Sequence, residues 1–309
     1  MISVVMPLYN KASFVEKSVV SVLSQTYEYF ELVIVNDGST DSSLEVITKF
    51  DDVRLKIVST ENRGAAAARN LGIKKAMNPY VALLDADDWW APTFLEETAR
   101  AITKFPDQKL FATGRSHVFE HLTKAYNNKL LPPPNRTAIL NHYQVISKHL
   151  PAINMSSAVV LKKHIEETGY LVEGMQNHED HEFWLRLAVN TGIVFINKPL
   201  SFYRKHILAS QSNKIFSASD FSTYLASCKQ VAWNIVTKEQ KWFQTYLNTF
   251  VLLCYLKYRN GYTKNETKLL EVKMDRMLTG VAFAIYSIAK VFPGINFYKV
   301  LKRLNGKQK

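Results

Sequence analysis

The sequence predicts an α/β fold with a mostly parallel sheet, helices on both of its faces, and a helical region at the C-terminus. Through about residue 120, short runs of β-branched and apolar residues alternate with stretches of helical periodicity, as in sheets whose strands are joined through helices. These runs are apolar at consecutive positions, which is expected where helices cover both faces of a parallel sheet. From about Ser210 onward the pattern is helical.

Four short strands are expected in the N-terminal part, each followed by a polar turn and a helical stretch. Their apolar cores are ISVVM, ELVIV, VRLKIV and YVALL, at residues 2–6, 31–35, 53–58 and 80–84. The polar segments PLYN, NDGSTD, ENRG and DADD follow these strands. Ligands bind at the carboxyl ends of the strands in such sheets, so we expect a ligand site at that edge.

The chain after residue 120 is expected to be less regular at first. Residues 121–150 contain LPPPN, which fits neither a regular helix nor a central strand and predicts an irregular crossing or flap. The segments SSAVVLKK, HEDHEFWLRLAVN, GIVFIN and LSFYRKH then predict a strand, a helix and two further strands. Beyond them, apolar residues from Phe221 to Ile235 recur at the spacing of an amphipathic helix.

Composition narrows the class of protein. The 309 residues are 47% hydrophobic, which is ample material for a packed core. The net charge of +12 comes mostly from residues 216–309, which hold 15 Lys/Arg against 5 Asp/Glu, whereas the preceding part holds 24 against 22. A basic excess of this kind suits nucleic acid, an anionic membrane surface or an anionic substrate, and charge alone does not choose among them.

The cysteine content favours a reducing compartment, and the hydropathy gives no segment long enough to span a membrane. Cys228 and Cys254 lie in apolar, helix-like surroundings, and two cysteines make neither a disulfide framework nor a metal-ligand set. The N-terminus enters a strand pattern without the features of a signal peptide. The apolar run that starts at Gly280 is shorter than the ~20 residues that span a bilayer. A cytoplasmic protein, soluble or bound to a membrane surface, is expected.

Three carboxylates follow the fourth strand. Asp85, Asp87 and Asp88 stand at the end of an apolar run, where burial is costly unless a cation compensates the charge. Mg²⁺ or Mn²⁺ held by one or two carboxylates and by substrate phosphates would supply that cation. A helix N-cap is the alternative for Asp88, but three acids at one strand end favour the metal site.

Two further residues point to the same edge. Asp37 ends the second strand before a glycine and can accept hydrogen bonds from a base or a ribose, although turn formation alone would also explain it. Arg69 lies early in an alanine-rich helix whose N-terminus faces the edge, a favourable place for an anion. A solvated helix arginine is the alternative for Arg69.

The segment HEDHEFWLR carries a candidate general base. Glu179 and Asp180 precede the apolar residues of a helix, where a carboxylate can serve as a base or can be favoured by the helix dipole alone. His178 and His181 are three residues apart, whereas the zinc motif of metalloproteases needs histidines four apart. A zinc site is therefore not expected.

Taken together, the motifs resemble a known family. VVMPLYN, VIVNDGSTDSS, ENRGAAAARNLGI, LLDADDWW and HEDHEFWLRLA occur in the order and spacing of the family 2 inverting glycosyltransferases of GT-A fold, of the bacterial surface-polysaccharide kind. The resemblance covers roughly residues 1–210. It implies a catalytic domain at 1–210, with a nucleotide-binding half at 1–120 and an acceptor-binding half at 121–210, followed by a helical, basic region at 211–309.

The resemblance also implies roles for single residues. Asp37 would contact the nucleobase, Arg69 would lie beside the nucleotide, and the first loop would line the same pocket with Pro7, Tyr9 and Asn10. Asp85, Ala86 and Asp87 would form the D-x-D motif, with Asp85 near the ribose and Asp87 on the metal. Asp180 would be the catalytic base, with Glu179 beside it. The segment FYRKHILASQS would close over the donor, with Arg204 and His206 near the diphosphate or metal, although a structural role for His206 remains an alternative.

The implied reaction is a metal-dependent transfer of one sugar, with inversion, from a nucleotide-diphospho-sugar to a glycan or a polyprenyl-diphosphate-linked acceptor. UDP and Mn²⁺ or Mg²⁺ are expected from the resemblance, and the sequence lacks the Gln-x-x-Arg-Trp motif of processive synthases. A nucleotidyltransferase is the alternative enzyme. A nucleic-acid-binding protein is disfavoured because the crevice would be acidic. The basic tail is expected either to dock on an anionic membrane surface, on the inner face of the plasma membrane, or to cover the sheet or form a homodimer.

Overall fold

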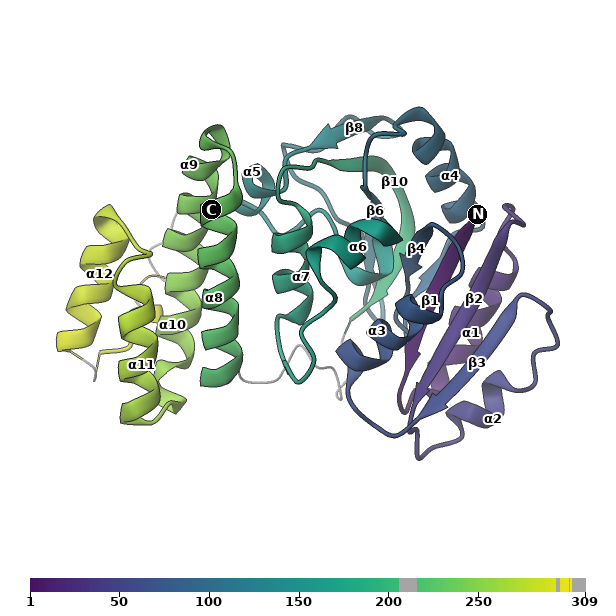
Figure 1. The fold of residues 1–309 in the computed structure, drawn as a ribbon, viewed down its shortest axis with the longest axis horizontal. Coiled ribbons are helices and arrows are strands. Elements are labelled where there is room, and N and C mark those ends of the chain that lie inside the picture. The colour runs from purple at the N-terminus through teal and green to yellow at the C-terminus, as the bar shows by residue number, and fades with distance from the viewer. Residues whose placement is uncertain (206–215, 293–294, 300, 302–309) are drawn as a thin grey trace.

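A computed structural model describes residues 1–205, 216–292, 295–299 and 301 of the chain. A large mixed sheet with helices around it forms one part of the molecule, and a group of helices forms the other (Figure 1). The main path of the sheet has the strand order β3-β2-β1-β4-β9-β6-β10-β5, with β7 paired to β6 and β8 paired to β10. The expected α/β fold class is confirmed.

The N-terminal strands follow the sequence expectation closely. They are β1 (Ile2–Leu8), β2 (Phe30–Asp37), β3 (Leu55–Thr60) and β4 (Tyr80–Leu83). All three pairings among them are parallel, so their carboxyl ends meet at one edge of the sheet. The register sets Leu8 opposite Asn36 and Asn36 opposite Ser59, and this alignment brings the polar segments after these strands together.

The second half of the sheet is mixed. Its strands are β5 (Trp89–Trp90), β6 (Leu110–Val118), β7 (Thr123–Ala125), β8 (Thr137–Leu140), β9 (Ala158–Leu161) and β10 (Ile193–Arg204). Strand β9 runs antiparallel to both β4 and β6, whereas β6 and β10 are parallel. The mostly parallel arrangement therefore describes the part that carries the first four strands.

Helices cover both faces of the sheet. Val15 and Val19 of α1 (Ala12–Leu23) and Phe94 of α4 (Phe94–Lys104) pack on one face. The other face is covered by α3 (Ala65–Lys75), α6 (Lys162–Thr168) and α7 (Glu179–Leu187). The short helix α2 (Ser43–Ile47) adds its buried Ile47 to the cluster on the α1 face. Alternate residues of the central strands enter opposite clusters, which explains their unbroken apolar runs.

One expectation in the second half needs correction. GIVFIN and the first residues of LSFYRKH do not form two strands, because β10 runs from Ile193 to Arg204 with register shifts on either side of Pro199. Proline has no N–H to donate, so it sits at the irregularity rather than ending the strand. A Cβ on the facing Gly114 would lie 2.7 Å from the carbonyl oxygen of Lys198, so the strands can approach there only because residue 114 is glycine. The strand expected within SSAVVLKK is confirmed as β9 (Ala158–Leu161), and α6 follows it directly.

The segment around LPPPN is irregular, as expected, but the wider range 121–150 that was expected to be irregular also holds two short strands and a short helix. Residues 126–136 contain no helix or strand, and β7 and β8 flank them. The short helix α5 (His142–Ile146) follows β8.

The C-terminal region is helical, as expected. It comprises α8 (Ala218–Asn234), α9 (Thr237–Tyr246), a π-helical turn at Leu247–Val251, α10 (Leu252–Tyr258), α11 (Lys264–Met274) and α12 (Gly280–Val291). Their apolar residues share one core with Tyr143 of α5 and Leu185 of α7. Cys228 and Cys254 are buried free thiols. Among the described residues, no helix has the length and hydropathy needed to cross a membrane.

Candidate active site

The four polar segments predicted to meet do so at the carboxyl ends of β1, β2, β3 and β4. Asp85 follows β4, and its Oδ1 atom accepts a hydrogen bond from Nη2 of Arg69 at 2.6 Å. Nη1 of Arg69 lies 3.4 Å from Oε1 of Glu179, at the start of α7. The guanidinium of Arg69 therefore joins α3, the end of β4 and α7.

Arg69 is not a solvated helix arginine, because only 6% of the residue is exposed. Burial by itself lowers the pKa of Arg69, but Asp85 and Glu179 more than offset it and raise the pKa above its usual value. The residue is therefore a fixed positive charge among carboxylates. A buried arginine of this kind is stable only with such partners.

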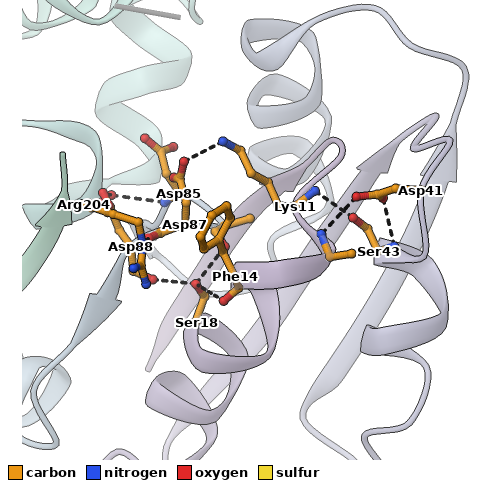
Figure 2. A network of polar contacts seen from close by, with 12 residues as sticks. Lys11, Phe14, Ser18, Asp41, Ser43, Asp85, Asp87, Asp88 and Arg204 are labelled. Atoms are coloured by element: carbon orange, nitrogen blue, oxygen red, sulfur yellow. Dashed lines mark hydrogen bonds and ion pairs between the residues drawn. The ribbon is translucent and has the colours of Figure 1, made fainter. Parts of the chain in front are cut away.

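Asp87 has its own cation. Its Oδ2 atom lies 2.6 Å from Nζ of Lys11, and both side chains are about four-fifths buried, with exposed fractions of 19% and 21% (Figure 2). The backbone of Lys11 is held by Oγ of Ser43 at 2.8 Å, which fixes the start of α1 against α2. The sequence reasoning missed Lys11, although it directly follows the PLYN segment.

Asp88 is buried and serves the structure. Its carboxylate accepts hydrogen bonds from Oγ of Ser156 and, at 2.9 Å, from the backbone N–H of Arg204. Burial, followed by the charges of Asp85 and Asp87, raises the pKa of Asp88 well above its usual value. The N-cap position of α4 belongs to Thr93, so the N-cap alternative for Asp88 is wrong. Asp88 instead ties β10 to the segment after β4.

The residues present fit a divalent cation that the substrate helps to bind. Within the described part of the chain, no group of three His, Cys, Asp or Glu side chains is arranged to hold a metal. Asp85 and Asp87 are partly exposed carboxylates, and each has one oxygen paired with a cationic side chain. Mg²⁺ takes one or two carboxylates and completes its shell with water and substrate phosphates, which is what these two residues offer.

The candidate base lies at the N-terminus of α7. His178 precedes the helix in a left-handed conformation with φ of 62°, and Glu179 and Asp180 occupy the first turn. Burial, followed by the charge of Asp180, raises the pKa of Glu179. Oδ1 of Asp180 accepts a hydrogen bond from the N–H of His181 at 2.7 Å. The two acids therefore differ in their partners, because Glu179 forms an ion pair with Arg69.

Asp37 is buried and holds the loop before α3. Its two oxygens accept hydrogen bonds from the backbone N–H groups of Arg63 at 2.9 Å and Gly64 at 2.8 Å. A hollow of about 90 Å³ lies beside it, lined by Asp37, Thr60, Arg63, Ala67, Ala68, Leu71, Lys74 and Glu173. Gly38 has φ of 66°, and a Cβ there would lie 2.8 Å from the backbone nitrogen of Asn62. The turn after Asp37 therefore requires glycine.

The first loop approaches the same edge. Pro7 lies within β1, and Tyr9 is 44% exposed. Asn10 has φ of 50°, and its Oδ1 accepts hydrogen bonds from the N–H groups of Thr40 and Asp41 at 2.8 and 3.3 Å. Asn10 thus fastens the loop after β1 to the loop after β2.

Of the three expected site residues not yet placed, Ala86 and Arg204 lie in the described part of the chain. Ala86 is buried, and its carbonyl oxygen accepts a hydrogen bond from Oγ of Ser18 at 2.9 Å. Nε of Arg204 donates to the backbone oxygen of Asp87 at 3.2 Å, and the guanidinium lies 5.0 Å from the ring centre of Trp89. His206 lies outside the described residues.

Comparison with known proteins supports a common origin with sugar-transferring enzymes. The glycosyl transferase family 2 model matches residues 3–158. An uncharacterized glycosyltransferase of Haemophilus influenzae is 29% identical over 71% of this chain and 84% of its own length. The Escherichia coli protein WfaP, named a UDP-Glc:α-D-GlcNAc-diphosphoundecaprenol β-1,3-glucosyltransferase, is 28% identical over 69% of this chain and 81% of its own.

A solved structure shares the fold over almost the whole chain. The crystal structure of S. aureus TarS 1–349 in complex with UDP-GlcNAc superposes with a TM-score of 0.74 and 19% identity, covering 99% of this chain and 92% of that one. The matched residues 3–158 include the ends of β1, β2, β3 and β4, where the site's acidic residues and Arg69 meet. The chain is a glycosyltransferase of GT-A fold and belongs to glycosyl transferase family 2.

Proposed function

We propose that the protein transfers one sugar, with inversion, from a UDP-sugar to a glycan or polyprenyl-diphosphate-linked acceptor in the synthesis of a surface polysaccharide. The observation that carries the proposal is the meeting of two acidic motifs around one buried arginine, since Arg69 contacts both Asp85 and Glu179. The motif with Asp85 and Asp87 suits a metal and a diphosphate, and the motif with Glu179 and Asp180 suits a general base. The relative WfaP, whose name gives a UDP-glucose donor and a diphosphoundecaprenol acceptor, supports these substrate classes.

The donor would lie along the carboxyl ends of the parallel strands. Asp37 and the hollow beside it are proposed for the nucleobase, with the lining completed by Pro7, Tyr9 and Asn10. Because both carboxylate oxygens of Asp37 already accept backbone hydrogen bonds, a base would share these oxygens through their remaining lone pairs. Asp85 is proposed for the ribose, and Arg69 and Arg204 for the neighbourhood of the diphosphate.

Asp87, with Asp85 beside it, would hold Mn²⁺ or Mg²⁺. When bound, such an ion neutralises charge that develops on the leaving diphosphate. Lys11 now occupies one oxygen of Asp87, so a metal and Lys11 would compete for that oxygen. We therefore propose that Lys11 turns toward the donor phosphates when the metal is bound. Asp88, with both oxygens engaged by the protein, is left out of the ligand set.

Asp180 is proposed as the general base. It would take the proton of the acceptor hydroxyl as that oxygen attacks the anomeric carbon, while the bond from that carbon to the diphosphate breaks on the opposite side. Glu179 is the weaker choice because it is paired with Arg69. Its proposed task is to keep Arg69 and the start of α7 in place beside Asp180.

The domain division follows from these assignments. We propose that residues 1–120 bind the nucleotide, that residues 121–210 bind the acceptor, and that residues 211–309 form a separate helical region. The basic excess of that region and the exposed apolar residues of α12, such as Val281 and Val291, favour docking on an anionic membrane surface at the inner face of the plasma membrane. A homodimer through the same face is the competing outcome.

A thermal-shift screen tests the proposed donor. The full chain is heated with UDP-, GDP- and CMP-sugars, with Mn²⁺ and again with a chelator. We expect UDP-sugars with Mn²⁺ to raise the melting temperature most, because a ligand that binds only the folded state stabilises it by mass action. If none of the nucleotide sugars raises it, the proposal is wrong. Release of pyrophosphate from UTP and a sugar phosphate would instead establish a nucleotidyltransferase.

A further inference from the structure

Three neighbouring strands place a row of basic side chains on one face of the sheet. In the register of β6 with β7 and β10, His117 lies opposite both Lys124 and Tyr203. Because side chains alternate along a strand, Arg115 and Lys205, each two residues away from a member of this row, belong to the same face. The contacts agree, since Nε of Arg115 lies 3.3 Å from Nε2 of His117 and Nζ of Lys205 lies 4.3 Å from the ring centre of Tyr203.

This basic row has no acidic counterpart in its own strands. The segments that form β6, β7 and β10 contain no Asp or Glu. Among the ion pairs of residues 1–205, 216–292, 295–299 and 301, none includes Arg115, Lys124 or Lys205. Neighbouring positive charges repel each other, and partial burial further raises the free energy of the charged side chains. An arrangement of this kind is stabilised when an anion binds.

The titration behaviour of the row is consistent with this crowding. Burial, followed by the charge of Arg115, lowers the pKa of His117 to about 4. The same two causes lower the pKa of Lys205. A bound anion would offset the repulsion felt by both side chains.

Arg115 is fixed, whereas the lysines are free to reach a ligand. The guanidinium of Arg115 donates to the carbonyl oxygens of Ala152 at 3.0 Å and Pro151 at 2.9 Å, and it lies 4.0 Å from the ring centre of Tyr126. It therefore contributes a fixed positive field. Lys124 is exposed and Lys205 is partly exposed, so their ammonium groups can close on an anion.

The row is connected to the elements that carry the candidate carboxylates. Arg115 donates to the carbonyl oxygen of Pro151 at 2.9 Å, and Pro151 lines a small hollow together with His181, which directly follows Asp180. Burial is the main cause of the raised pKa of Tyr203, and the charges of Asp88, Asp85, Asp87 and Asp180 add to it. Asp180 likewise acts on Arg115, and Asp88 acts on Lys205. The basic row is thus within electrostatic reach of the proposed catalytic carboxylates. Two of the cations at the donor edge, Lys11 and Arg69, are already paired with acids.

We infer that Lys205, Lys124 and His117 form a second anion subsite, which binds a phosphate group carried by the acceptor. The inference rests on the proposed function and names the acceptor class: a sugar or polyol attached to a phosphate, a phosphodiester or a diphosphate. The donor diphosphate belongs at Asp85 and Asp87, so an anion on the face of Asp180 belongs to the molecule whose hydroxyl Asp180 deprotonates. Lys205 and Lys124 are specificity residues in this scheme.

The test measures phosphate binding with the donor site filled. Full-length protein saturated with UDP and Mg²⁺ is titrated calorimetrically with inorganic phosphate. We expect one binding event in the wild type and a loss of at least about tenfold in affinity in the K124M/K205M double variant, because two charged contacts disappear. The exposed Lys129, in the irregular segment that follows β7, supplies the control K129M, which should bind phosphate like the wild type.

The same titration separates the subsite from the proposed function. Failure of the wild type to bind UDP would contradict the proposed function, whereas normal UDP binding with no phosphate binding would contradict the subsite alone. UDP affinity must be the same in K124M/K205M as in the wild type, which also shows that the variant is folded. Equal phosphate affinity in the double variant and the wild type would overturn the inference.

Competition identifies the source of the phosphate. A short-chain prenyl diphosphate sugar and a soluble polyol phosphate oligomer are each added to the phosphate-loaded wild type. Displacement by the former indicates a lipid-linked acceptor, and displacement by the latter indicates a phosphate-containing polymer. If neither displaces inorganic phosphate better than an uncharged methyl glycoside does, the row does not bind the acceptor.

Discussion

At the scale of single residues, the site is a set of paired charges rather than an open cluster of acids. Asp87 contacts Lys11, Asp85 contacts Arg69, and Arg69 extends to Glu179. Such ion pairs offset part of the free energy that it costs to place charged side chains in partly buried positions. A metal that uses the paired oxygen of Asp87 would have to displace Lys11, so we expect the binding of metal and of diphosphate to depend on each other.

Asp87→Asn should remove metal-dependent donor binding and leave the fold intact. The amide lacks the charge that attracts a divalent ion, and the freed Lys11 is partly exposed and can be solvated. Calorimetric titration of UDP with and without Mn²⁺ is the measurement. Asp107→Asn, at an exposed acid just before the N-terminus of β6, is the control. Unchanged UDP affinity in Asp87→Asn would remove Asp87 from the metal site.

Asp180→Asn should retain donor affinity but lower turnover by roughly 10²- to 10⁴-fold, the usual contribution of a general base. Initial rates at saturating donor and acceptor measure it, with UDP affinity determined in parallel. Glu179→Gln is the matched comparison, because it alters the neighbouring acid and leaves Asp180 unchanged. A larger loss of turnover in Glu179→Gln than in Asp180→Asn would make Glu179 the base.

At the scale of elements, helix α7 is anchored so that its first turn stays in place. Glu182 is completely buried and pairs with Arg186, whose Nε lies 2.6 Å from Oε1 of Glu182. Arg186 also donates to the carbonyl oxygens of Thr168, Gly169 and Tyr170. Oγ of Ser227 in α8 donates to the same Glu182 oxygen at 2.6 Å. The C-terminal helices thus help to hold the helix that carries Asp180.

Arg186→Met should destabilise the protein by about 3 kcal/mol or more, because it leaves the buried Glu182 carboxylate without its cation. Urea denaturation at pH 7 measures the free energy of unfolding. Arg100→Met is the control, since Arg100 is largely exposed and its pairs with Glu96 and Glu97 lie at the surface, where such pairs contribute little. Equal stability of the two variants would show that Glu182 finds another partner.

At the scale of the whole molecule, α12 lies at the end of the long axis away from β3 (Figure 1). Its inner face contributes Ala282, Tyr286 and Ala289 to the helical core. Its outer face is apolar as well, with Val281, Ile288 and Val291 exposed by 76%, 48% and 70%. A surface helix normally presents polar residues to water, so this face is suited to a further contact.

Deleting residues 280–309 should abolish co-sedimentation with anionic liposomes and spare UDP binding. The apolar face would insert at the headgroup boundary, and each nearby Lys or Arg would add about 1 kcal/mol of attraction. The double variant I288S/V291S tests the same face without removing the inner contacts. Membrane docking would be refuted if the full-length protein does not co-sediment with anionic liposomes at low salt. It would also be refuted if the protein forms a dimer that I288S/V291S abolishes.

The linear order of strands and motifs could be predicted from the sequence because it depends on local patterns. The four N-terminal strands and the helix at Phe221–Ile235 are confirmed within a few residues. The segment around LPPPN is irregular over 126–136, which is shorter than the expected range of 121–150. The continuity of β10 does not follow from local pattern, because a proline such as Pro199 is unfavourable inside a strand. Only the neighbouring β6, with Gly114 opposite, allows the strand to continue.

The sequence by itself determined the family, the α/β class and the set of acids at the strand ends, since these are fixed by residue types and spacings along the chain. The tertiary structure alone decided how the charges pair. Lys11 and Asp87 are 76 residues apart in sequence, and Arg69 and Glu179 are 110 apart. Parallel strand register and the approach of α7 bring them into contact. The basic row of Arg115, His117 and Lys205 likewise exists only because β6 and β10, distant in sequence, are neighbours in the sheet.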